Sequence, residues 1–315
     1  LNKEFEELKR FHKEILGELF PESDHSIYNE INNLFVEVEW AIEDAATGTY
    51  DFEYDQIVSI GELASTKIVS AYLNDNGVKS KWFDVRDIIK TDNTYREGNV
   101  YWDETILNTH NTIGKHFENN SGIAITQGFI GCTSENFTTT LGREGSDYSA
   151  GILAYGLGAT EMTIWKDVPG MLNADPKWFD STEKLNHISY REAIELAYYG
   201  ATVIHPKTIK PLQNKSIPLH VKSFLDYTTE GTLIDEETTE DSLNPSFIFK
   251  MDQLLISLSP KDFSFIVEGN MQDIFGVFSK HKVTMNLMQN SALNLSVTVD
   301  NDEQKTPGLL EELKK

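Results

Sequence analysis

Hydroxyls, glycines and charged side chains gather in one short stretch of the chain, residues 138–150, which reads TTTLGREGSDYSA. A helical pattern follows it, and the start of a helix offers unpaired backbone N–H groups and the positive end of a dipole. Gly142 and Gly145 would let a ligand approach the backbone closely. Arg143 adds a planar group that can bind a carboxylate through two parallel hydrogen bonds. This combination predicts a site for a phosphate or a carboxylate.

The same stretch also allows a purely structural interpretation. A helix with one apolar face is expected over 147–156, and Ser146 or Asp147 could simply cap its first turn. Spacing alone does not decide between a ligand site and a helix cap.

A second stretch, residues 161–176, reads EMTIWKDVPGMLNADP. Together the two stretches resemble aspartate kinase, whose corresponding segments read TTLGRGGSDY and IWTDVxGxYTADPR. Three further matches occur in the same order along the chain, and together the matches cover most of residues 61–234. They are GELAS at 61–65, TQGFIG at 126–131, and one that runs from ISYREA at 188–193 to GATVIHP at 200–206. One short motif is weak support, but five in order are strong.

The resemblance implies ATP-dependent phosphorylation of the side-chain carboxylate of L-aspartate to 4-phospho-L-aspartate, the first step of lysine, threonine and methionine biosynthesis. ATP and Mg²⁺ are the implied cofactors, and positioning with charge neutralisation is sufficient for such chemistry in principle. Two alternatives stay open: a kinase for another acidic amino acid, and a non-catalytic sensor that binds an amino acid.

The resemblance also assigns the substrate site. Arg143 is expected to hold a carboxylate of aspartate and Glu62 its ammonium group. Phe129 falls where the family has an aromatic residue in the substrate pocket, and Ser146 is expected to bind substrate as well. Asp147 matches the carboxylate that orients a catalytic lysine in the family.

The nucleotide is expected to contact Lys166, Asp167, Leu172, Lys177 and Thr202. Four of these depart from the family, which usually has threonine, tyrosine, arginine and lysine at the positions of Lys166, Leu172, Lys177 and Thr202. Lysine keeps the charge of arginine but loses its forked geometry. Lys166 could replace the charge that is missing at Thr202, or it could be a solvated surface lysine.

The family begins with a KFGGTS strand-to-helix turn whose lysine contacts the transferring phosphoryl group. No segment of the chain matches this turn. The N-terminal strands of the catalytic domain are therefore expected to be missing from this sequence, and the chain as given could be inactive without them.

Composition restricts the class of protein. The chain has 315 residues, 39% of them hydrophobic, which is enough for a sizeable core in two domains. Its formal net charge of -23 argues against nucleic-acid or anionic-membrane partners. No apolar stretch is long enough to cross a bilayer. A single cysteine, Cys132, excludes an intramolecular disulfide, and nothing resembles a signal peptide, so a cytoplasmic location is expected.

Hydrophobic periodicity predicts alternating helices and strands up to about residue 234. Expected helices lie at 5–19, 28–45, 62–73 and 189–199, the last with a capping box, and expected strands at 81–85, 122–129, 137–141 and 217–224, with 137–141 pairing back in a hairpin. Such alternation favours an α/β fold with a largely parallel sheet. The resemblance narrows this to the three-layer αβα sandwich of the amino-acid kinases over residues 1–240.

The acidic run 235–241 is expected to be a linker to a second domain, residues 241–315. A strand, a helix, two strands and a helix are expected there, at 254–258, 271–281, 283–287, 293–299 and from 306. This order resembles an ACT domain, the ferredoxin-like regulatory module, without its final strand. The resemblance implies an amino-acid effector, lysine or threonine, and a homodimer formed through ACT domains.

The regulatory residues match lysine-inhibited relatives only in part. Gly269 stands at a matching glycine of the first ACT helix and Ser291 at a matching serine. Asn286 replaces an aspartate, and a neutral amide cannot pair ionically with a lysine ammonium group. Binding of an effector by these three residues is the expectation that the sequence supports least.

Overall fold

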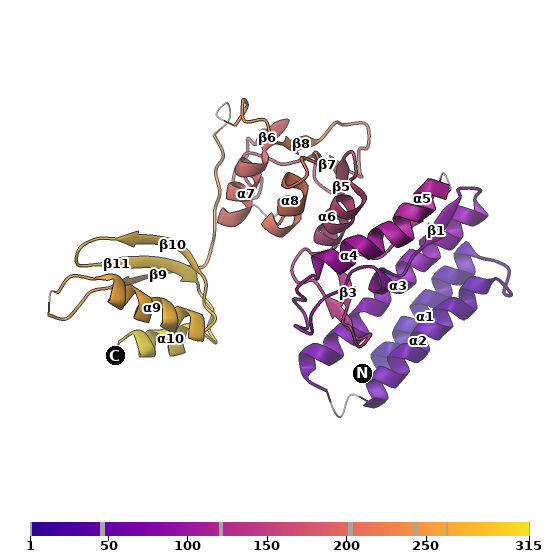
Figure 1. The fold of residues 1–315 in the computed structure, drawn as a ribbon, viewed down its shortest axis with the longest axis horizontal. Coiled ribbons are helices and arrows are strands. Elements are labelled where there is room, and N and C mark those ends of the chain that lie inside the picture. Colours follow the sequence, from indigo (N-terminus) through magenta and orange to yellow (C-terminus); the bar gives the residue numbers. More distant parts are fainter. Residues whose placement is uncertain are drawn as a thin grey trace. The chain divides into compact units, whose positions relative to one another are not determined.

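The structure is a computed structural model that describes residues 2–44, 48–119, 122–200, 204–241, 245–262 and 264–314. The chain forms two compact units, one comprising residues 1–198 and 202–246 and the other residues 199–201 and 247–315 (Figure 1). Each unit has its own buried apolar cluster, so each is described separately.

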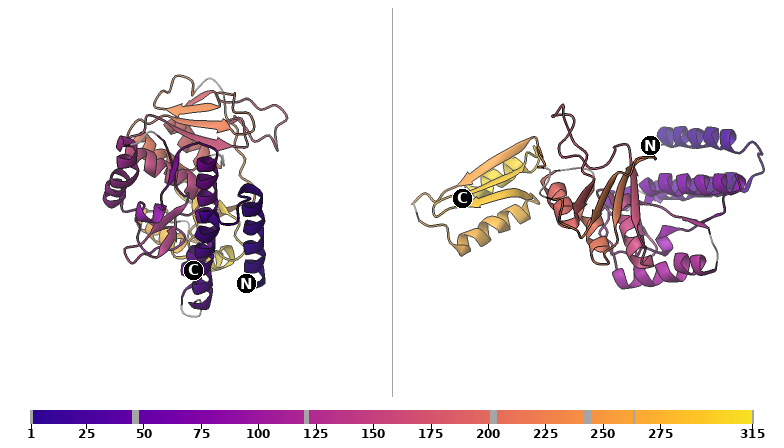
Figure 2. Two further views of the ribbon diagram at one scale, coloured as in Figure 1. Left: turned by 90° about the vertical axis from the view of Figure 1, so that its right-hand side faces the viewer. Right: turned by 90° about the horizontal axis from the view of Figure 1, so that it is seen from above.

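Three long helices open the first unit: α1 (Asn2–Leu19), α2 (Ser26–Asp44) and α3 (Tyr50–Asp75). Helix α2 packs against both of its neighbours, and Ile27 and Ile31 on its buried face are each 1% exposed (Figure 2). The first two helices were predicted from the apolar periodicity at 5–19 and 28–45, and both are confirmed. Helix α3 starts well before the expected residue 62, because Thr49 caps it by accepting a hydrogen bond from the backbone N–H of Phe52.

Parallel pairs prevail among the described strands of this unit. Strand β1 (Ser80–Trp82) pairs in parallel with β2 (Ile123–Ile125). A four-stranded sheet has the order β5 (Met162–Lys166), β7 (Leu219–Ser223), β8 (Thr232–Asp235) and β6 (His187–Ser189). In it the β5–β7 and β6–β8 pairs are parallel and only β7–β8 is antiparallel. These pairings agree with the expected α/β class.

The expected hairpin has a different first strand. Strand β4 (Thr138–Thr140) pairs with β3 (Ile130–Cys132), not with residues 122–129. The reason is local: the chain leaves β2 after Ile125, and Phe129 adopts a left-handed conformation with φ 51°, which turns the chain before β3 begins.

Helices cover these strands. They are the short η1 (Val85–Asp87), α4 (Trp102–Thr109), the π-helical η2 (His110–Gly114), α5 (Lys115–Asn119), α6 (Gly145–Leu157), α7 (Tyr190–Tyr199) and α8 (Pro206–Gln213). Helix α6 packs against α4 and α8. Its glycines allow this, since a Cβ on Gly151 would lie 3.0 Å from the carbonyl oxygen of Thr208 and one on Gly156 3.0 Å from Cγ2 of Thr109.

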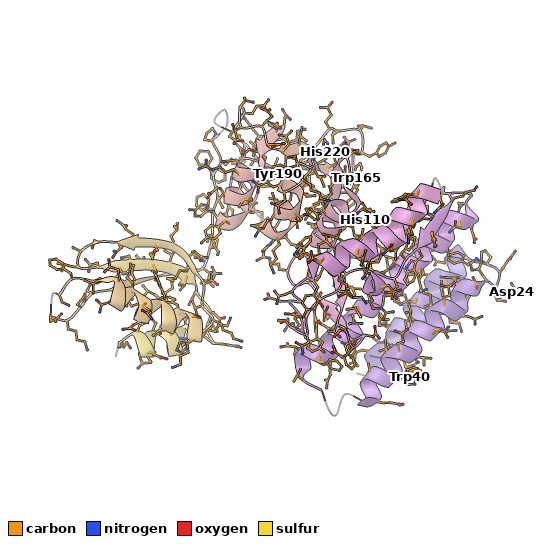
Figure 3. The ribbon with its side chains drawn as sticks, viewed as in Figure 1. Asp24, Trp40, His110, Trp165, Tyr190 and His220 are labelled. Atoms are coloured by element: carbon orange, nitrogen blue, oxygen red, sulfur yellow. The ribbon has the colours of Figure 1, made fainter. Side chains whose placement is uncertain are left out.

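Helix α7 is fixed at its start by buried polar contacts. The hydroxyl of Tyr190 donates to the carbonyl of Ile217 at 2.5 Å, and burial raises the pKa of Tyr190 to about 12 (Figure 3). Ser189 Oγ accepts from the backbone N–H of Glu192 at 3.0 Å, which is one half of the expected capping box, and donates to Asp241 Oδ2 at 2.6 Å. The other half differs from the prediction, because the backbone N–H of Ser189 donates to Asp241 Oδ1 at 2.8 Å and not to Glu192. The acidic run that was expected to be a free linker is therefore anchored at Asp241.

The second unit contains β9 (Gln253–Leu258), α9 (Glu268–Lys280), β10 (Met285–Asn290), β11 (Leu295–Asp300) and α10 (Thr306–Leu313). Its strands form an antiparallel sheet in the order β10-β11-β9. Ile256, Phe278, Val297 and Leu309 are buried between this sheet and the two helices. The predicted order of strands and helices is confirmed. In the described part of the chain, no helix is long and apolar enough to span a membrane.

Candidate active site

The loop after β2 meets the first turn of α6. A Cβ atom on Gly128 would lie 2.7 Å from Oγ of Ser146, and one on Gly145 would lie 2.7 Å from Cβ of Phe129. Only glycine fits such close approaches. Glu62 of α3 joins the group, because its Oε1 accepts a hydrogen bond from the backbone N–H of Gly128 at 3.1 Å. Three of the residues expected to bind substrate, Glu62, Phe129 and Ser146, are thus brought together.

Gln127 is a supporting residue that sequence reasoning missed. It is 1% exposed, and its Oε1 accepts from the backbone N–H of Val85 at 2.8 Å. Its Nε2 donates to Thr66 Oγ1 at 2.9 Å, and Thr66 in turn donates to the backbone carbonyl of Glu62 at 2.9 Å. This chain of bonds fixes α3 relative to the loop that carries Phe129. The sequence signal that could have pointed to Gln127 is its place in the TQG segment, directly before Gly128.

The turn that carries Arg143 is held by unusual backbone conformations. Gly142 has φ 79° and Glu144 has φ 53°, and the backbone N–H of Gly145 donates to the carbonyl of Gly142 at 3.1 Å. Arg143 between them is exposed, and the described residues offer it no ion pair. Glu144 stands where the quoted aspartate kinase segment has glycine, and its Oε2 is buried without a hydrogen-bond partner. The turn thus stores strain next to an available guanidinium group.

Asp147 forms an ion pair that links a helix to a strand. Its Oδ2 lies 2.9 Å from Nζ of Lys166, and the side chains are 16% and 25% exposed. Lys166 ends β5, whereas Asp147 lies in the first turn of α6. The alternative in which Lys166 is a solvated surface lysine is therefore wrong. Neither Ser146 nor Asp147 caps α6, because Glu144 occupies the N-cap position and provides no side-chain cap.

Asp55 anchors the strand that leads into the Arg143 turn. It is fully buried in α3; its Oδ2 accepts from the backbone N–H groups of Arg96 at 2.7 Å and Thr140 at 2.9 Å, and its Oδ1 accepts from Thr140 Oγ1 at 2.9 Å. Burial raises the pKa of Asp55, although these donors and Arg96 oppose the shift. Sequence reasoning missed this residue because its partners lie far away in the chain.

The residues expected to bind the nucleotide are only partly brought together. Asp167, Leu172 and Lys177 follow β5 in one loop, in which Asp167 and Lys177 are exposed. The loop is attached to the sheet through the backbone N–H of Met171, which donates to Thr232 Oγ1 at 2.8 Å. Of these residues in the described part of the chain, Lys166 is the one that forms an ion pair with Asp147. Thr202 lies outside the described residues.

The three regulatory candidates occupy different places in the second unit. Gly269 lies in the first turn of α9, and Ser291 closes the β10–β11 hairpin, where its Oγ accepts from the backbone N–H of Asn294 at 3.1 Å. Asn286 Oδ1 accepts from Lys250 Nζ at 2.8 Å, and its Nδ2 donates to Asp300 Oδ1 at 2.9 Å. These contacts give Ser291 and Asn286 structural roles and do not unite the three residues in one site.

The geometry can now be compared with known proteins. The sequence profile of the amino acid kinase family matches residues 16–223. The chain belongs to the amino acid kinase family. Within this family its relatives are aspartokinases. Lysine-sensitive aspartokinase 3 of Escherichia coli is 33% identical over 282 residues, which are 90% of this chain and 62% of the relative. Aspartokinase 1 of Arabidopsis thaliana is 31% identical over 252 residues, or 78% of this chain and 43% of that protein.

Solved structures of this amino acid kinase family agree. The complex of Escherichia coli aspartokinase III with aspartate and ADP has a TM-score of 0.84 and 30% identity, covering 99% of this chain and 70% of the other. The same enzyme with lysine and aspartate gives a TM-score of 0.81. The resemblance to aspartate kinase is thereby confirmed. The chain spans less than two thirds of the length of these curated relatives.

Proposed function

We propose that the protein is an aspartate kinase that transfers the γ-phosphoryl group of ATP to the side-chain carboxylate of L-aspartate. The observation that carries the proposal is the convergence of Glu62, Phe129 and Ser146 beside the Arg143 turn at the start of α6. The complexes of the Escherichia coli relative with aspartate and with ADP support the same substrate and nucleotide.

In this proposal each group has a separate task. Arg143 binds a carboxylate of aspartate through two parallel hydrogen bonds. Glu62 uses Oε1 to hold the Gly128 loop, which leaves Oε2 to accept from the substrate ammonium group. The free N–H groups at the start of α6 stabilise negative charge on the phosphoryl group being transferred.

Lys166 contributes the positive charge at the reacting phosphoryl group. Asp147 fixes its ammonium group at the carboxyl end of β5, which is where open α/β sheets bind their ligands. Asp167, Leu172 and Lys177 in the following loop, with Thr202, contact the nucleotide. In this arrangement strand β5 provides the cation, while the start of α6 recognises the substrate and adds N–H donors for the phosphoryl group.

Mg²⁺ fits this site as part of the nucleotide complex. Within the described ranges no three His, Cys, Asp or Glu side chains gather in a metal-binding group. Magnesium usually keeps its waters and is held by substrate phosphates with one or two carboxylates. Asp167 is the carboxylate that follows β5 and would supply such a ligand, while the ion would neutralise phosphate charge.

The proposal extends to regulation by an amino acid, lysine or threonine, and to a homodimer formed through the C-terminal unit. The name of the Escherichia coli relative and its lysine complex support a lysine effect. Titrating each amino acid into the kinase assay tests it, and sedimentation of the protein tests the dimer.

The decisive experiment traps the acyl phosphate with hydroxylamine. The protein encoded by the complete reading frame should form aspartyl hydroxamate only with ATP, Mg²⁺ and aspartate. Arg143→Ala should lower kcat/KM for aspartate by about 100-fold or more, the loss expected when a charged hydrogen-bonding pair is removed. The control is Arg191→Ala, which removes a different exposed arginine, located on α7, and should leave turnover unchanged.

Other outcomes discriminate between the alternatives. Turnover with glutamate but not aspartate would assign a kinase for another acidic amino acid. Absence of turnover in a folded protein that still binds aspartate in calorimetry would assign a sensor.

A further inference from the structure

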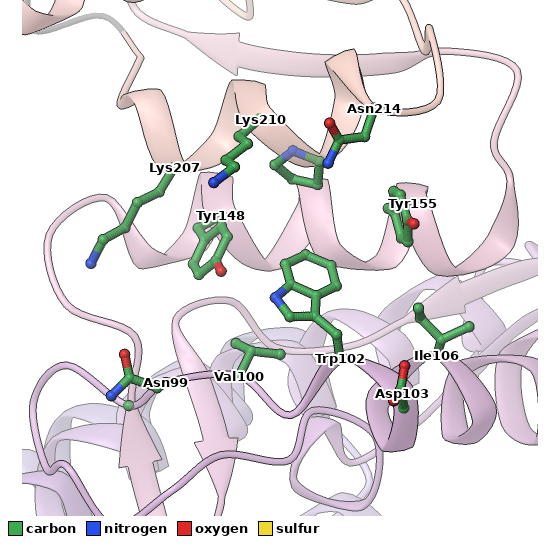
Figure 4. Close-up of a pocket in the computed structure, with 12 residues that line it drawn as sticks. Asn99, Val100, Trp102, Asp103, Ile106, Tyr148, Tyr155, Lys207, Lys210 and Asn214 are labelled. Atoms are coloured by element: carbon green, nitrogen blue, oxygen red, sulfur yellow. The ribbon is translucent and has the colours of Figure 1, made fainter.

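A cavity of about 510 Å³ lies between α4, α6 and α8 in the first unit (Figure 4). Its volume falls within the range of sites that bind small molecules. Arg143, Asp147 and Lys166 are not among the residues that line it. The cavity is therefore separate from the candidate active site, although both use α6.

Aromatic side chains form one wall of the cavity. Trp102 makes edge contacts with two tyrosines of α6, with ring centroids 6.5 Å from Tyr148 and 5.5 Å from Tyr155. Lys215 holds the end of this wall, because its Nζ donates to the carbonyl of Tyr155 at 2.6 Å and lies 4.2 Å from the centre of that ring. The apolar surface is thus preformed, which reduces the entropy lost when a ligand binds.

Two lysines of α8 supply the cationic part of the lining. Lys207 and Lys210 are three residues apart on the helix and so share a face, and Figure 4 shows both side chains on the same side of the cavity as Tyr148. Neither ammonium group forms an ion pair with a carboxylate in the described ranges. Both side chains are exposed, so their charge is available to a ligand at the mouth of the cavity.

The remaining polar residues of the lining restrict the charge that a ligand can carry. Asp103 lines the cavity from α4, away from the two lysines in Figure 4, and Asn99 and Asn214 complete the polar rim. A polyphosphate that extended along the cavity would be repelled by Asp103. A ligand with a single negative charge at one end and an apolar body avoids this repulsion.

We propose that this cavity binds a small organic anion made of a planar ring and one carboxylate. The ring packs against Trp102 and Tyr148, and the carboxylate accepts charge-assisted hydrogen bonds from Lys207 and Lys210. The anion can be a simple aromatic acid or the carboxylate end of an aromatic amino acid. This site goes beyond the proposed kinase activity and does not depend on it.

Isothermal titration calorimetry of the full chain tests the proposal with three probes that share one ring: phenylacetate, L-phenylalanine and the neutral phenylacetamide. Phenylacetate should bind at least about tenfold more tightly than phenylacetamide, because only the anion uses the lysines. Tighter binding of phenylalanine than of phenylacetate would identify the amino acid as the preferred source, and weaker binding would identify the simple aromatic acid.

Paired variants locate the binding. The double variant Lys207→Gln/Lys210→Gln should weaken phenylacetate by about tenfold or more. A matched control, Lys79→Gln/Lys115→Gln, removes the same charge from exposed lysines outside the cavity and should change the affinity less than about twofold. Equal binding of the anion and the amide, binding unaffected by the first double variant, or no binding of any probe to the folded protein would overturn the proposal.

Discussion

The contact between Asp147 and Lys166 is short and largely shielded from water. An exposed ion pair contributes little, but this one lies 2.9 Å apart with both side chains at most a quarter exposed, so solvent screens it less. The pair also fixes the direction of a long flexible side chain. The Lys166 side chain has therefore already lost most of its rotational freedom before it contacts a phosphoryl group, so that entropy is not lost during the reaction.

Lys166→Met should abolish most of the kinase turnover. It removes the ammonium group while keeping a long side chain, and we expect kcat to fall by about 100-fold or more, the scale seen when one group that stabilises transition-state charge is lost. KM for aspartate should change little, because Lys166 does not touch the substrate residues. Hydroxamate formation measured against both substrates separates these effects.

Lys166→Arg is the matched control for that variant, since it keeps the charge and should retain part of the turnover. An unchanged kcat in Lys166→Met, with an unchanged melting temperature, would remove this lysine from the mechanism.

Protonation of His205 at the start of α8 should lower the stability of the folded protein. It caps α8, where its Nδ1 accepts from the backbone N–H of Lys207 at 3.1 Å. This cap gives His205 a structural role at the start of α8, directly before Pro206. Burial lowers the pKa of His205, the charges of Lys207 and Arg143 lower it further, and Glu144 and Glu97 oppose them.

The free energy of unfolding should therefore depend on pH through His205. Because the pKa is lower in the folded protein, the unfolded chain takes up the proton first as the pH falls below the ordinary value of 6.5. The contribution of the neutral cap is present above that pH and is lost below it. Urea unfolding between pH 7.5 and pH 5 of wild type and His205→Asn, which caps without titrating, measures the difference. Parallel pH curves would contradict the prediction.

Helix α3 acts as a support for the hairpin before the Arg143 turn. Asp55 binds the backbone of Thr140, and the neighbouring Gln56 exchanges two hydrogen bonds with the backbone of Thr138, at 2.8 Å and 3.0 Å. Strand β4 is therefore held along its whole length by one turn of a helix that is distant in sequence. The position of Arg143 depends on that support.

Asp55→Ala should destabilise the first unit by about 2–4 kcal/mol, because two buried N–H groups and a hydroxyl lose their acceptor. Asp55→Asn should cost much less, since the amide oxygen can still accept from both N–H groups and the amide nitrogen can face Thr140 Oγ1. Denaturant unfolding measures both changes. Equal losses in the two variants would show that charge, not hydrogen bonding, is what Asp55 contributes.

The sequence predicts elements well where the pattern is local. Apolar periodicity locates α1 and α2, and the segments of the C-terminal unit follow the expected order. The early start of α3 and the true partner of β4 were not predicted, because the Thr49 cap and the turn at Phe129 have no apolar periodicity. The contacts of Asp55 and Gln56 with β4 were missed for another reason, since they join residues more than 80 positions apart. Likewise, short motifs identify Arg143 and Asp147, but only the fold brings Lys166 to Asp147. Contacts between residues distant in the chain produce no periodic pattern of apolar residues in the sequence.

Each of the two units buries apolar side chains of its own among the described residues. The C-terminal unit buries a small cluster around Val297, which is 1% exposed, between three strands and two helices. Small units bury a smaller fraction of their surface than large ones, so this unit should be the less stable of the two. Unfolding of the whole protein is then not a two-state process.

Val297→Ala should lower the unfolding temperature of the C-terminal unit alone. The loss of two buried methyl groups costs about 2 kcal/mol. Differential scanning calorimetry of the full chain should show one transition shifted and the other unchanged. Val69→Ala makes the same chemical change at a position that is 47% exposed and should shift neither transition. A common shift of both transitions by Val297→Ala would mean that the cores unfold together.

The left-handed Glu144 has a consequence for laboratory evolution. Glycine adopts this conformation at no steric cost, and its substitution would also remove a buried carboxylate oxygen that lacks a partner. Every glutamate codon becomes a glycine codon when its middle base changes from adenine to guanine. A selection for heat resistance therefore has a one-nucleotide route to Glu144→Gly, and this substitution should be among the first to be recovered.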